Sequence, residues 1–240
     1  MPMTDIAEIW VYLSRAPLLW LTATLAAYSV GDFCYRAANR APLVNPVLIA
    51  VVLLAGLLWI TDTSYQRYFE GAQFVHFLLG PATVCLAYPL YENLPRVRKA
   101  LLPMLAALLA GSLTAVISAL AVGYALGVRG EALASLSAKS TTAPVAIGIA
   151  EKIGGSPTLT AVLVIMTGIL GAAMATPLLN ALGLTDWRAR GFAVGVAAHG
   201  LGTARAMQVN PTAGAFAGLG MGLNAVLTAL LAPYILKLFL

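Results

Sequence analysis

A lysine and three hydroxyl side chains interrupt an apolar stretch of the chain at Lys139-Ser140-Thr141-Thr142. Pro144 follows them, and an apolar run continues to residue 150. As a helix, residues 144–152 would be about 13 Å long at about 1.5 Å per residue, under half of a hydrocarbon core about 30 Å thick. A helix that begins at mid-membrane leaves backbone groups unpaired, which is tolerated only where they line a cavity or meet a ligand. The stretch therefore predicts a substrate site inside a membrane protein.

The chemistry of this first group is that of an anion site. A charge near the bilayer centre costs at least about 2.5–3.5 kcal/mol, so Lys139 is expected to face a cavity or a partner. We expect Lys139 to attract an anionic substrate and Ser140, Thr141 and Thr142 to supply hydroxyls. Thr142 or Ala143 would cap the helix that follows, with the positive end of that helix at the same place. The alternative puts Lys139 at the membrane interface, where its long side chain reaches the headgroups.

A second polar group, formed by His199, Gly200, Gly202, Thr203 and Arg205, interrupts another apolar stretch. The glycines allow a helix to unwind or to approach a neighbour closely. Arg205 can bind a carboxylate through two parallel hydrogen bonds, and His199 titrates near neutrality and could couple proton movement to transport. The alternative is that Arg205 begins a loop and that His199 is a packing residue.

Two weaker features complete the predicted substrate site. Gly80, Pro81 and Thr83 occupy the corresponding region of the first half, where a Gly-Pro pair breaks a helix and frees carbonyl groups, although it could be only a kink. Asn224 is a lone polar residue in an apolar segment. Such residues either face a ligand or link helices by hydrogen bonds.

The composition indicates an all-α, polytopic integral membrane protein. Of the 240 residues, 60% are hydrophobic and only 10% are charged, against about 25% charged in soluble domains. Apolar segments predict about seven to eight transmembrane segments, some of them broken or re-entrant. The net charge of +5 is assigned to cytoplasmic loops and not to nucleic-acid binding. Cys34 and Cys85 lie in apolar segments and are expected as core residues, so neither a metal site nor a cofactor is predicted.

Short matches between the two halves predict an internal repeat. Thr61-Asp62 matches Thr185-Asp186, and Leu79-Gly80 matches Leu201-Gly202, in the same order along the chain. We predict one membrane domain, residues 1–240, with repeat units at about 17–127 and 132–240. The distribution of basic residues favours an inverted repeat, which needs an odd number of crossings in each unit. Residues 132–155 are the candidate re-entrant segment, and eight full crossings are the alternative.

The motifs resemble one known family. The sequences Lys139-Ser-Thr-Thr-Ala-Pro-Val-Ala146 and His199-Gly-Leu-Gly-Thr-Ala-Arg-Ala206 are similar to those of the LrgB/CidB family, as is Leu79-Gly-Pro-Ala-Thr-Val84. The resemblance covers nearly the whole chain from about residue 20. It implies an antiholin-like membrane protein that modulates murein hydrolase export and autolysis. The family also includes plastid glycolate and glycerate carriers and bacterial members linked to pyruvate uptake, and it often works with a small LrgA/CidA-like membrane protein.

Together these observations predict a carrier for small organic anions, 2-hydroxy or 2-oxo monocarboxylates such as glycolate, glycerate or pyruvate, working by proton-coupled alternating access. The alternative is an antiholin-like regulator without a substrate site. Enzyme activity is not expected, because the chain has no Gly-x-Ser-x-Gly elbow and its two histidines are not near a carboxylate cluster. The expected location is the bacterial inner membrane. The expected partners are the carboxylate, the lipid bilayer, an LrgA/CidA-like protein and, through glycine-rich helix faces, a second copy of the chain.

Overall fold

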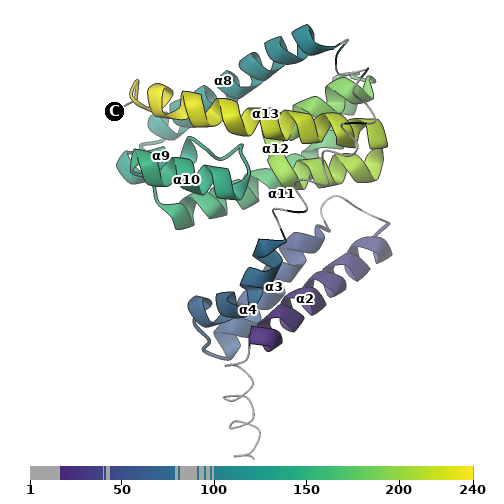
Figure 1. Cartoon of the computed structure of the whole chain (residues 1–240), viewed down its shortest axis with the longest axis vertical. Helices are drawn as coiled ribbons and strands as arrows, with labels where there is room; N and C mark the ends of the chain where they lie inside the picture. Colours follow the sequence, from purple (N-terminus) through teal and green to yellow (C-terminus); the bar gives the residue numbers. More distant parts are fainter. Residues whose placement is uncertain are drawn as a thin grey trace, which may run out of the picture. The chain divides into compact units, whose positions relative to one another are not determined.

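The computed structural model describes residues 17–39, 41, 44–78, 81, 91, 95, 98 and 100–239. These residues form nine helices and no strand, which confirms the all-α prediction (Figure 1). The chain divides into two compact units, Met1–Cys85 and Leu86–Leu240, and each is described by itself.

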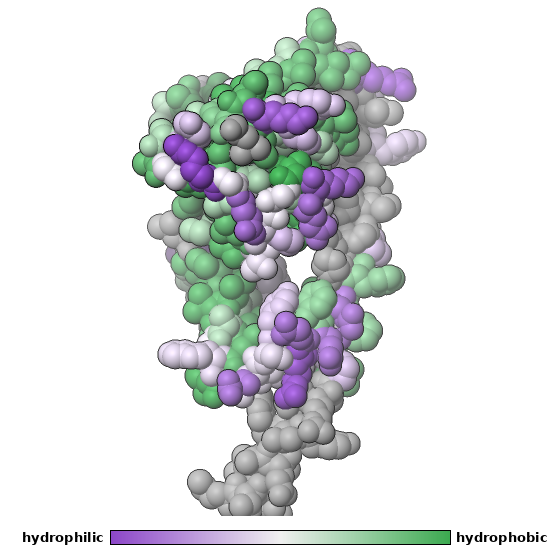
Figure 2. All heavy atoms as spheres, turned by 90° about the vertical axis from the view of Figure 1, so that its left-hand side faces the viewer, coloured by the Kyte–Doolittle hydropathy of each residue, from purple (hydrophilic) through white to green (hydrophobic). Residues whose placement is uncertain are grey.

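Three described helices are long and apolar enough to cross a membrane: α8 (Leu101–Ala125), α11 (Pro157–Ala181) and α13 (Pro211–Leu236). Large apolar side chains are exposed at every fourth residue of α11, at Val162, Met166, Leu170, Met174 and Leu178. Figure 2 shows hydrophobic residues over much of the face that it presents, with hydrophilic residues gathered in patches. An apolar stripe of this kind is what a helix presents to lipid.

The first unit is a group of three helices: α2 (Pro17–Ala37), α3 (Pro46–Ile60) and α4 (Tyr65–Phe77). Trp20, only 1% exposed, meets the ring of Tyr68 edge-on at 6.0 Å between centroids. Asn45 precedes α3 and caps it, because its Oδ1 accepts hydrogen bonds from the amides of Val47 at 2.8 Å and Leu48 at 3.2 Å. The first unit is thus held by packing and by an N-cap at the start of α3.

In the second unit, α9 (Gly130–Leu136) and α10 (Ala143–Ile153) form a helical hairpin, here called the first hairpin. The chain reverses direction between them: the amide nitrogen of Ser135, near the end of α9, lies 2.9 Å from where a Cβ on Gly155, just beyond α10, would be. The Ser156 amide also donates to Ser135 Oγ at 2.8 Å. Residues 137–142, the first tip, connect α9 to α10. The segment therefore folds back on itself, and the re-entrant assignment of residues 132–155 in the membrane stays a prediction.

Helix α12 (Trp187–Val209) is a second hairpin, where the residue pattern predicts only an interrupted helix. His199 has φ 42° and ψ −134°, which breaks the helix into residues 187–198 and 200–209. A Cβ on Gly202 would lie 2.9 Å from Val194 Cγ1. In a continuous helix, residues eight positions apart are about 12 Å apart, so this contact requires the arms to fold against each other. His199 is the second tip.

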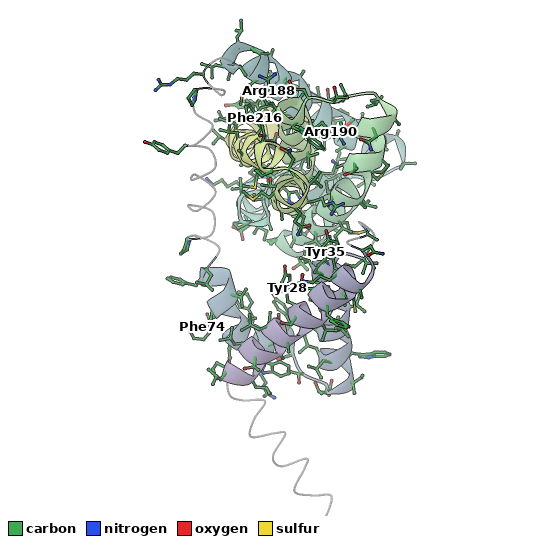
Figure 3. All side chains as sticks on the ribbon, turned by 90° about the vertical axis from the view of Figure 1, so that its right-hand side faces the viewer. Tyr28, Tyr35, Phe74, Arg188, Arg190 and Phe216 are labelled. Carbon is green, nitrogen blue, oxygen red and sulfur yellow. The ribbon has the colours of Figure 1, made fainter. Side chains whose placement is uncertain are left out.

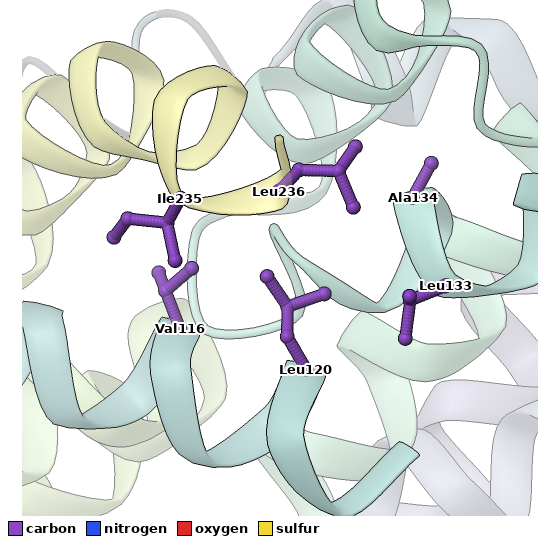
Figure 4. Packing of buried hydrophobic residues seen from close by; sticks show 6 residues of the cluster. All are labelled: Val116, Leu120, Leu133, Ala134, Ile235 and Leu236. Atoms are coloured by element: carbon purple, nitrogen blue, oxygen red, sulfur yellow. The ribbon is translucent and has the colours of Figure 1, made fainter. Parts of the chain in front are cut away.

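The two hairpins open toward opposite ends of the second unit. At one end, here called the α9 end, the end of α8 and the end of α13 pack on α9 (Figure 4). The residues of this cluster are Val116, Leu120, Leu133, Ala134, Ile235 and Leu236. At the other end, the α12 end, the beginnings of α8 and α13 pack on the first arm of α12 through Met104, Leu108, Phe192, Val196 and Phe216. The two tips are consequently brought to a level between the ends, where α8, α11 and α13 pass them.

Two glycines on the first arm of α12 let it pack backbone to backbone on α13. Gly191 faces the carbonyl of Ala213, and Gly195 faces the carbonyl of Ala217. Small residues four apart on both helices permit this approach, which larger side chains would prevent. The same packing fixes the height of the second tip relative to α13.

Candidate functional site

The first tip presents a charge, two buried hydroxyl residues and the beginning of a helix. Lys139 is half-buried, and its Nζ donates to Ser140 Oγ at 3.1 Å. Ser140 and Thr141 are buried. Helix α10 begins after Thr142, with Pro144 in its first turn, and the Thr142 side chain makes no capping hydrogen bond. The amides of that first turn are therefore not capped by Thr142, and the helix presents its positive end at the tip.

The second tip is a strained residue held by its side chain. His199 Nε2 lies 2.9 Å from the carbonyl oxygen of Val164 on α11. A carbonyl only accepts, so Nε2 carries the hydrogen and Nδ1 is the nitrogen left for another contact. The Thr203 hydroxyl donates to the carbonyl of His199 at 2.8 Å. A positive φ at a residue other than glycine is costly and persists only where surrounding contacts impose it, a condition common at functional sites.

Gly168 on α11 makes room for the His199 ring. A Cβ at this position would lie 2.6 Å from His199 Cε1 and 2.7 Å from Leu201 Cδ1. We expect Gly168→Ala to lower the free energy of unfolding by about 1 kcal/mol, because the ring must shift from its bond to Val164. Denaturant titration of the purified protein measures this. Gly148→Ala is the matched control, since nothing lies within 4 Å of a Cβ there; equal losses in the two variants would contradict the prediction.

Asn224, near the middle of α13, joins both tips to the long helices. Its Nδ2 donates to the carbonyls of Ser140 at 3.0 Å and Val196 at 3.1 Å. Its Oδ1 accepts from the hydroxyls of Ser112 at 2.6 Å and Thr228 at 3.2 Å. An asparagine side chain has two donors and two lone pairs, so all four are used within the protein. Asn224 is 0% exposed, and these bonds make it a fixed point between α8, α12, α13 and the first tip.

The two tips are neighbours. One amide nitrogen reaches a carbonyl from each of them, Ser140 in the first hairpin and Val196 in the second. Val164, which bonds His199, packs in one cluster with Ala138 and Ala146 of the first hairpin. Residues about 60 positions apart in the sequence thus surround one point inside the unit.

Four helix ends lie at the tips, and two of them are N-termini. Helix α10 and the second arm of α12 both begin at the tips, so both direct amide N–H groups toward them. Two carbonyls that would oppose this polarity, those of Ser140 and Val196, are covered by the Asn224 amide. Together with the Lys139 charge, the arrangement favours an anion at the tips.

Arg205 lies away from the tips, about 9 Å along the second arm of α12 from His199 at about 1.5 Å per residue. It lines a cavity of about 30 Å³ with Arg190, Trp187 and Thr176. Of the other predicted site residues, Gly200 is at the break, and Gly202 faces the opposite arm. Pro81 is exposed in the first unit, whereas Gly80 and Thr83 lie outside the described residues. The expectation that Lys139 and Arg205 hold one carboxylate stays a prediction.

Sequence reasoning missed several residues that support the tips: Ser112, Val164, Gly168 and Thr228. Ser112 and Thr228 had a usable signal, because hydroxyl residues in apolar segments often link helices. Val164 had none, since it contributes only its backbone carbonyl. Within the described ranges, no group of three His, Cys, Asp or Glu side chains is placed to hold a metal ion.

These features define a multi-pass helical membrane protein with two opposed hairpins. The chain belongs to the LrgB-like family, whose model matches residues 24–238.

It is 32% identical over 222 residues to a protein named "Holin-like protein CidB" from Staphylococcus epidermidis, covering 92% of this chain and 96% of the relative. It is 34% identical, with the same coverage, to the uncharacterized protein YxaC of Bacillus subtilis. An uncharacterized protein of Haemophilus influenzae is 34% identical over 194 residues, 81% of this chain and 84% of that one. No solved structure matches the chain. The protein is accordingly a multi-pass bacterial membrane protein.

Proposed function

We propose that this protein is a membrane carrier for small organic anions, 2-hydroxy or 2-oxo monocarboxylates, and that the carboxylate binds between the two hairpin tips. The observation that supports this best is the meeting of Lys139 with two helix N-termini at one buried point, while the Asn224 amide covers carbonyls beside it. Positive helix ends at mid-membrane are the usual means by which transporters hold anionic groups.

The residues of the tips divide into ligands and supports in this proposal. Lys139 supplies the charge, the first-turn amides of α10 supply donors, and Ser140 and Thr142 supply hydroxyls to the carboxylate or the 2-hydroxyl group. His199 presents Nδ1 and carries the coupled proton. Asn224 and Thr203 support the tips, because their hydrogen-bonding groups already have protein partners.

The opposed hairpins suggest how access could alternate. The first hairpin opens at the α9 end and the second at the α12 end, so displacement of either would expose the tips to a different side of the membrane. Protonation of His199 would keep the hydrogen bond from Nε2 to the Val164 carbonyl. It would also add a second donor at Nδ1, toward the anion. Anion and proton would then bind together, as co-transport requires.

The charges at the two ends favour one orientation. Arg188 and Arg190 lie at the α12 end, where the sequence also carries Arg96, Arg98 and Lys99 just before α8. Cytoplasmic ends of membrane proteins carry the excess of Lys and Arg, so we place the α12 end in the cytoplasm.

Cysteine labelling tests this orientation. In a variant lacking Cys34 and Cys85, we expect Glu131→Cys, at the α9 end, to react with an impermeant maleimide added to intact cells. Thr185→Cys, at the α12 end, should react only after the cells are opened. Both positions are exposed, so accessibility within the protein is matched. The reverse pattern would show that the orientation is wrong.

Uptake by proteoliposomes tests the carrier function. We expect labelled glycolate, glycerate or pyruvate to accumulate, and Lys139→Gln to reduce the initial rate about 10- to 100-fold, because a hydrogen bond to a charged group contributes about 1.5–3 kcal/mol. Lys152→Gln is the matched control: it removes the same charge from the exposed end of the same hairpin. Equal rates for all three proteins would overturn the site, and no uptake of any of these acids by the unmodified protein would overturn the function.

A holin-like function is the second candidate, because relatives such as the Staphylococcus epidermidis protein carry that name. In this case the protein would regulate murein hydrolase export and autolysis without a substrate site, acting through a small LrgA/CidA-like membrane protein or a second copy of itself. It predicts that Lys139→Gln leaves autolysis unchanged while changes at helix-packing glycines abolish it. Measuring autolysis and uptake on the same variants separates the two functions.

A further inference from the structure

A groove of about 560 Å³ lies between α8 and the first arm of α12. It begins at the α12 end, where Ala100 and Arg188 line it, and it continues to Ala115 and Ala197. Figure 3 labels Arg188 and Phe216, two of the residues that line the groove. From Ala100 to Ala115 it extends about 22 Å along α8, at about 1.5 Å per residue. One leaflet of the hydrocarbon core is about 15 Å thick, so the groove is long enough to follow an acyl chain through it.

The walls of the groove are apolar and built from small side chains. Alanine or glycine recurs every four residues on both helices, at Ala107, Gly111 and Ala115 of α8 and at Ala189, Ala193 and Ala197 of α12. The two helices touch beneath it, because a Cβ on Gly111 would lie 3.2 Å from Val196 Cγ1. Ala107, Ala193 and Ala197 are exposed. An exposed apolar groove along a membrane-crossing helix meets acyl chains.

The mouth of the groove, at the α12 end, is cationic. Arg188 donates to both carboxylate oxygens of Asp186 at 2.6 to 3.1 Å, which holds the pKa of that carboxyl below its ordinary value, so the two form a neutral ion pair. Within the described part of the chain, Nη1 of Arg188 makes no hydrogen bond. Arg98 is exposed two residues before the groove begins, and Arg96 and Lys99 are next to it in the sequence. These three basic residues give the mouth an excess of positive charge.

We propose that this groove binds one anionic phospholipid from the leaflet at the α12 end, with an acyl chain between α8 and α12 and the phosphate at Arg98 and Arg188. Basic pockets between transmembrane helices on the cytoplasmic side bind anionic lipid headgroups, and the α12 end is the one that we place in the cytoplasm. A guanidinium can hold a phosphate through two parallel hydrogen bonds.

Two other occupants fit the groove less well. A small free anion would lie among alanine, phenylalanine and methionine side chains, which offer it no hydrogen-bond donors. An apolar helix of a second copy would leave the charges at the mouth without a partner. A phospholipid satisfies both the apolar walls and the cationic mouth.

Native mass spectrometry of the purified, full-length protein counts the bound lipid. We titrate delipidated protein in detergent with dioleoyl phosphatidylglycerol and, separately, with dioleoyl phosphatidylcholine, which has the same chains but no net charge. We expect one tight site for phosphatidylglycerol and about tenfold weaker binding of phosphatidylcholine. Glycerol 3-phosphate, which has the phosphate but no acyl chain, should not displace the lipid.

A matched pair of variants tests the place of the acyl chain. Ala107→Phe fills the groove and should lose the tight site. Ala106→Phe, at an exposed neighbour that does not line the groove, should keep it. If Ala107→Phe does not elute as a folded protein, Ala193→Leu narrows the groove from the α12 side and replaces it.

A second pair tests the headgroup. Arg98→Gln combined with Arg188→Gln should weaken phosphatidylglycerol binding about 25-fold, because each basic residue beside an anionic lipid surface contributes about fivefold in affinity. Binding of phosphatidylcholine should change little. Arg129→Gln combined with Lys152→Gln removes two exposed charges at the α9 end and should leave both affinities unchanged.

Equal affinities for the two lipids, or unchanged binding in the groove-filling variant, would overturn this inference. Displacement of the lipid by glycerol 3-phosphate would overturn it in favour of a free phosphate. A dimer that disappears in Ala107→Phe, without a tight lipid site, would overturn it in favour of a second copy of the chain. None of these readouts uses uptake, so they stand or fall independently of the carrier function.

Discussion

Replacing Asn224 by leucine is expected to abolish uptake and to lower the free energy of unfolding by about 3 kcal/mol. The substitution leaves the Ser140 and Val196 carbonyls and the Ser112 hydroxyl without their partner in a buried site. Each buried polar group left unpaired costs about 1–3 kcal/mol, although hydrogen bonds between membrane helices average nearer about 0.6 kcal/mol. The Thr228 hydroxyl adds less, because it can turn to a carbonyl of its own helix.

Denaturant titration in detergent measures the stability, and proteoliposome uptake measures the function. Ser112→Ala is the comparison, because it removes one of the four hydrogen bonds and leaves both tips attached to Asn224. We expect it to cost under about 1 kcal/mol and to retain most of the uptake. If Asn224→Leu is no less stable than Ser112→Ala, the tips are not held together by Asn224.

Gly195→Ala should be the second severe substitution, with a loss of about 3 kcal/mol in the free energy of unfolding. A methyl group there would overlap the Ala217 carbonyl, which belongs to the backbone of α13 and cannot rotate away. The first arm of α12 would have to move off α13, and its Val196 carbonyl would leave the Asn224 amide. We therefore expect uptake to fall with stability.

Gly222→Ala provides the matched control for this prediction. Gly222 lies on α13 itself, and nothing is within 4 Å of a Cβ at that position. Because alanine favours a helix over glycine by about 0.5–1 kcal/mol, this variant should be as stable as the unmodified protein or slightly more so. Equal destabilisation by the two substitutions would mean that glycine flexibility, and not close packing, matters at residue 195.

The two hairpins differ in how far the sequence predicts them. The first is predictable because its apolar run is too short to cross and is bounded by polar residues, including Lys139 and Thr142. The second is not, because residues 187–209 are long enough for a crossing helix. Its break is at a histidine, which adopts a positive φ far less readily than glycine does, and glycines follow it on one side only. What imposes the break is the bond from His199 to the Val164 carbonyl and the room left by Gly168.

The candidate site is likewise predictable from the sequence only in part. Lys139 and His199 are recognisable from their types, since a charged or titratable side chain in an apolar segment needs a partner. Their proximity depends on contacts between segments far apart in the chain, above all those of Asn224. That Arg205 and Arg190 line one small cavity between the arms of α12 is likewise not predictable before α12 is seen to fold back. The proposed repeat over residues 17–127 and 132–240 stays a prediction.

The sequence by itself determined the class of protein, its helical character and the two polar groups that interrupt its apolar segments. These follow from local properties: the length of an apolar run, the cost of a charge in hydrocarbon, and the residue types that begin or break a helix. Only the tertiary structure decided that both polar groups are hairpin tips, that they meet beside Asn224, and that Arg205 lines a small cavity away from the tips. The reason is that these outcomes depend on backbone carbonyls and on space beside glycines, which contacts with other helices create and residue types alone do not specify.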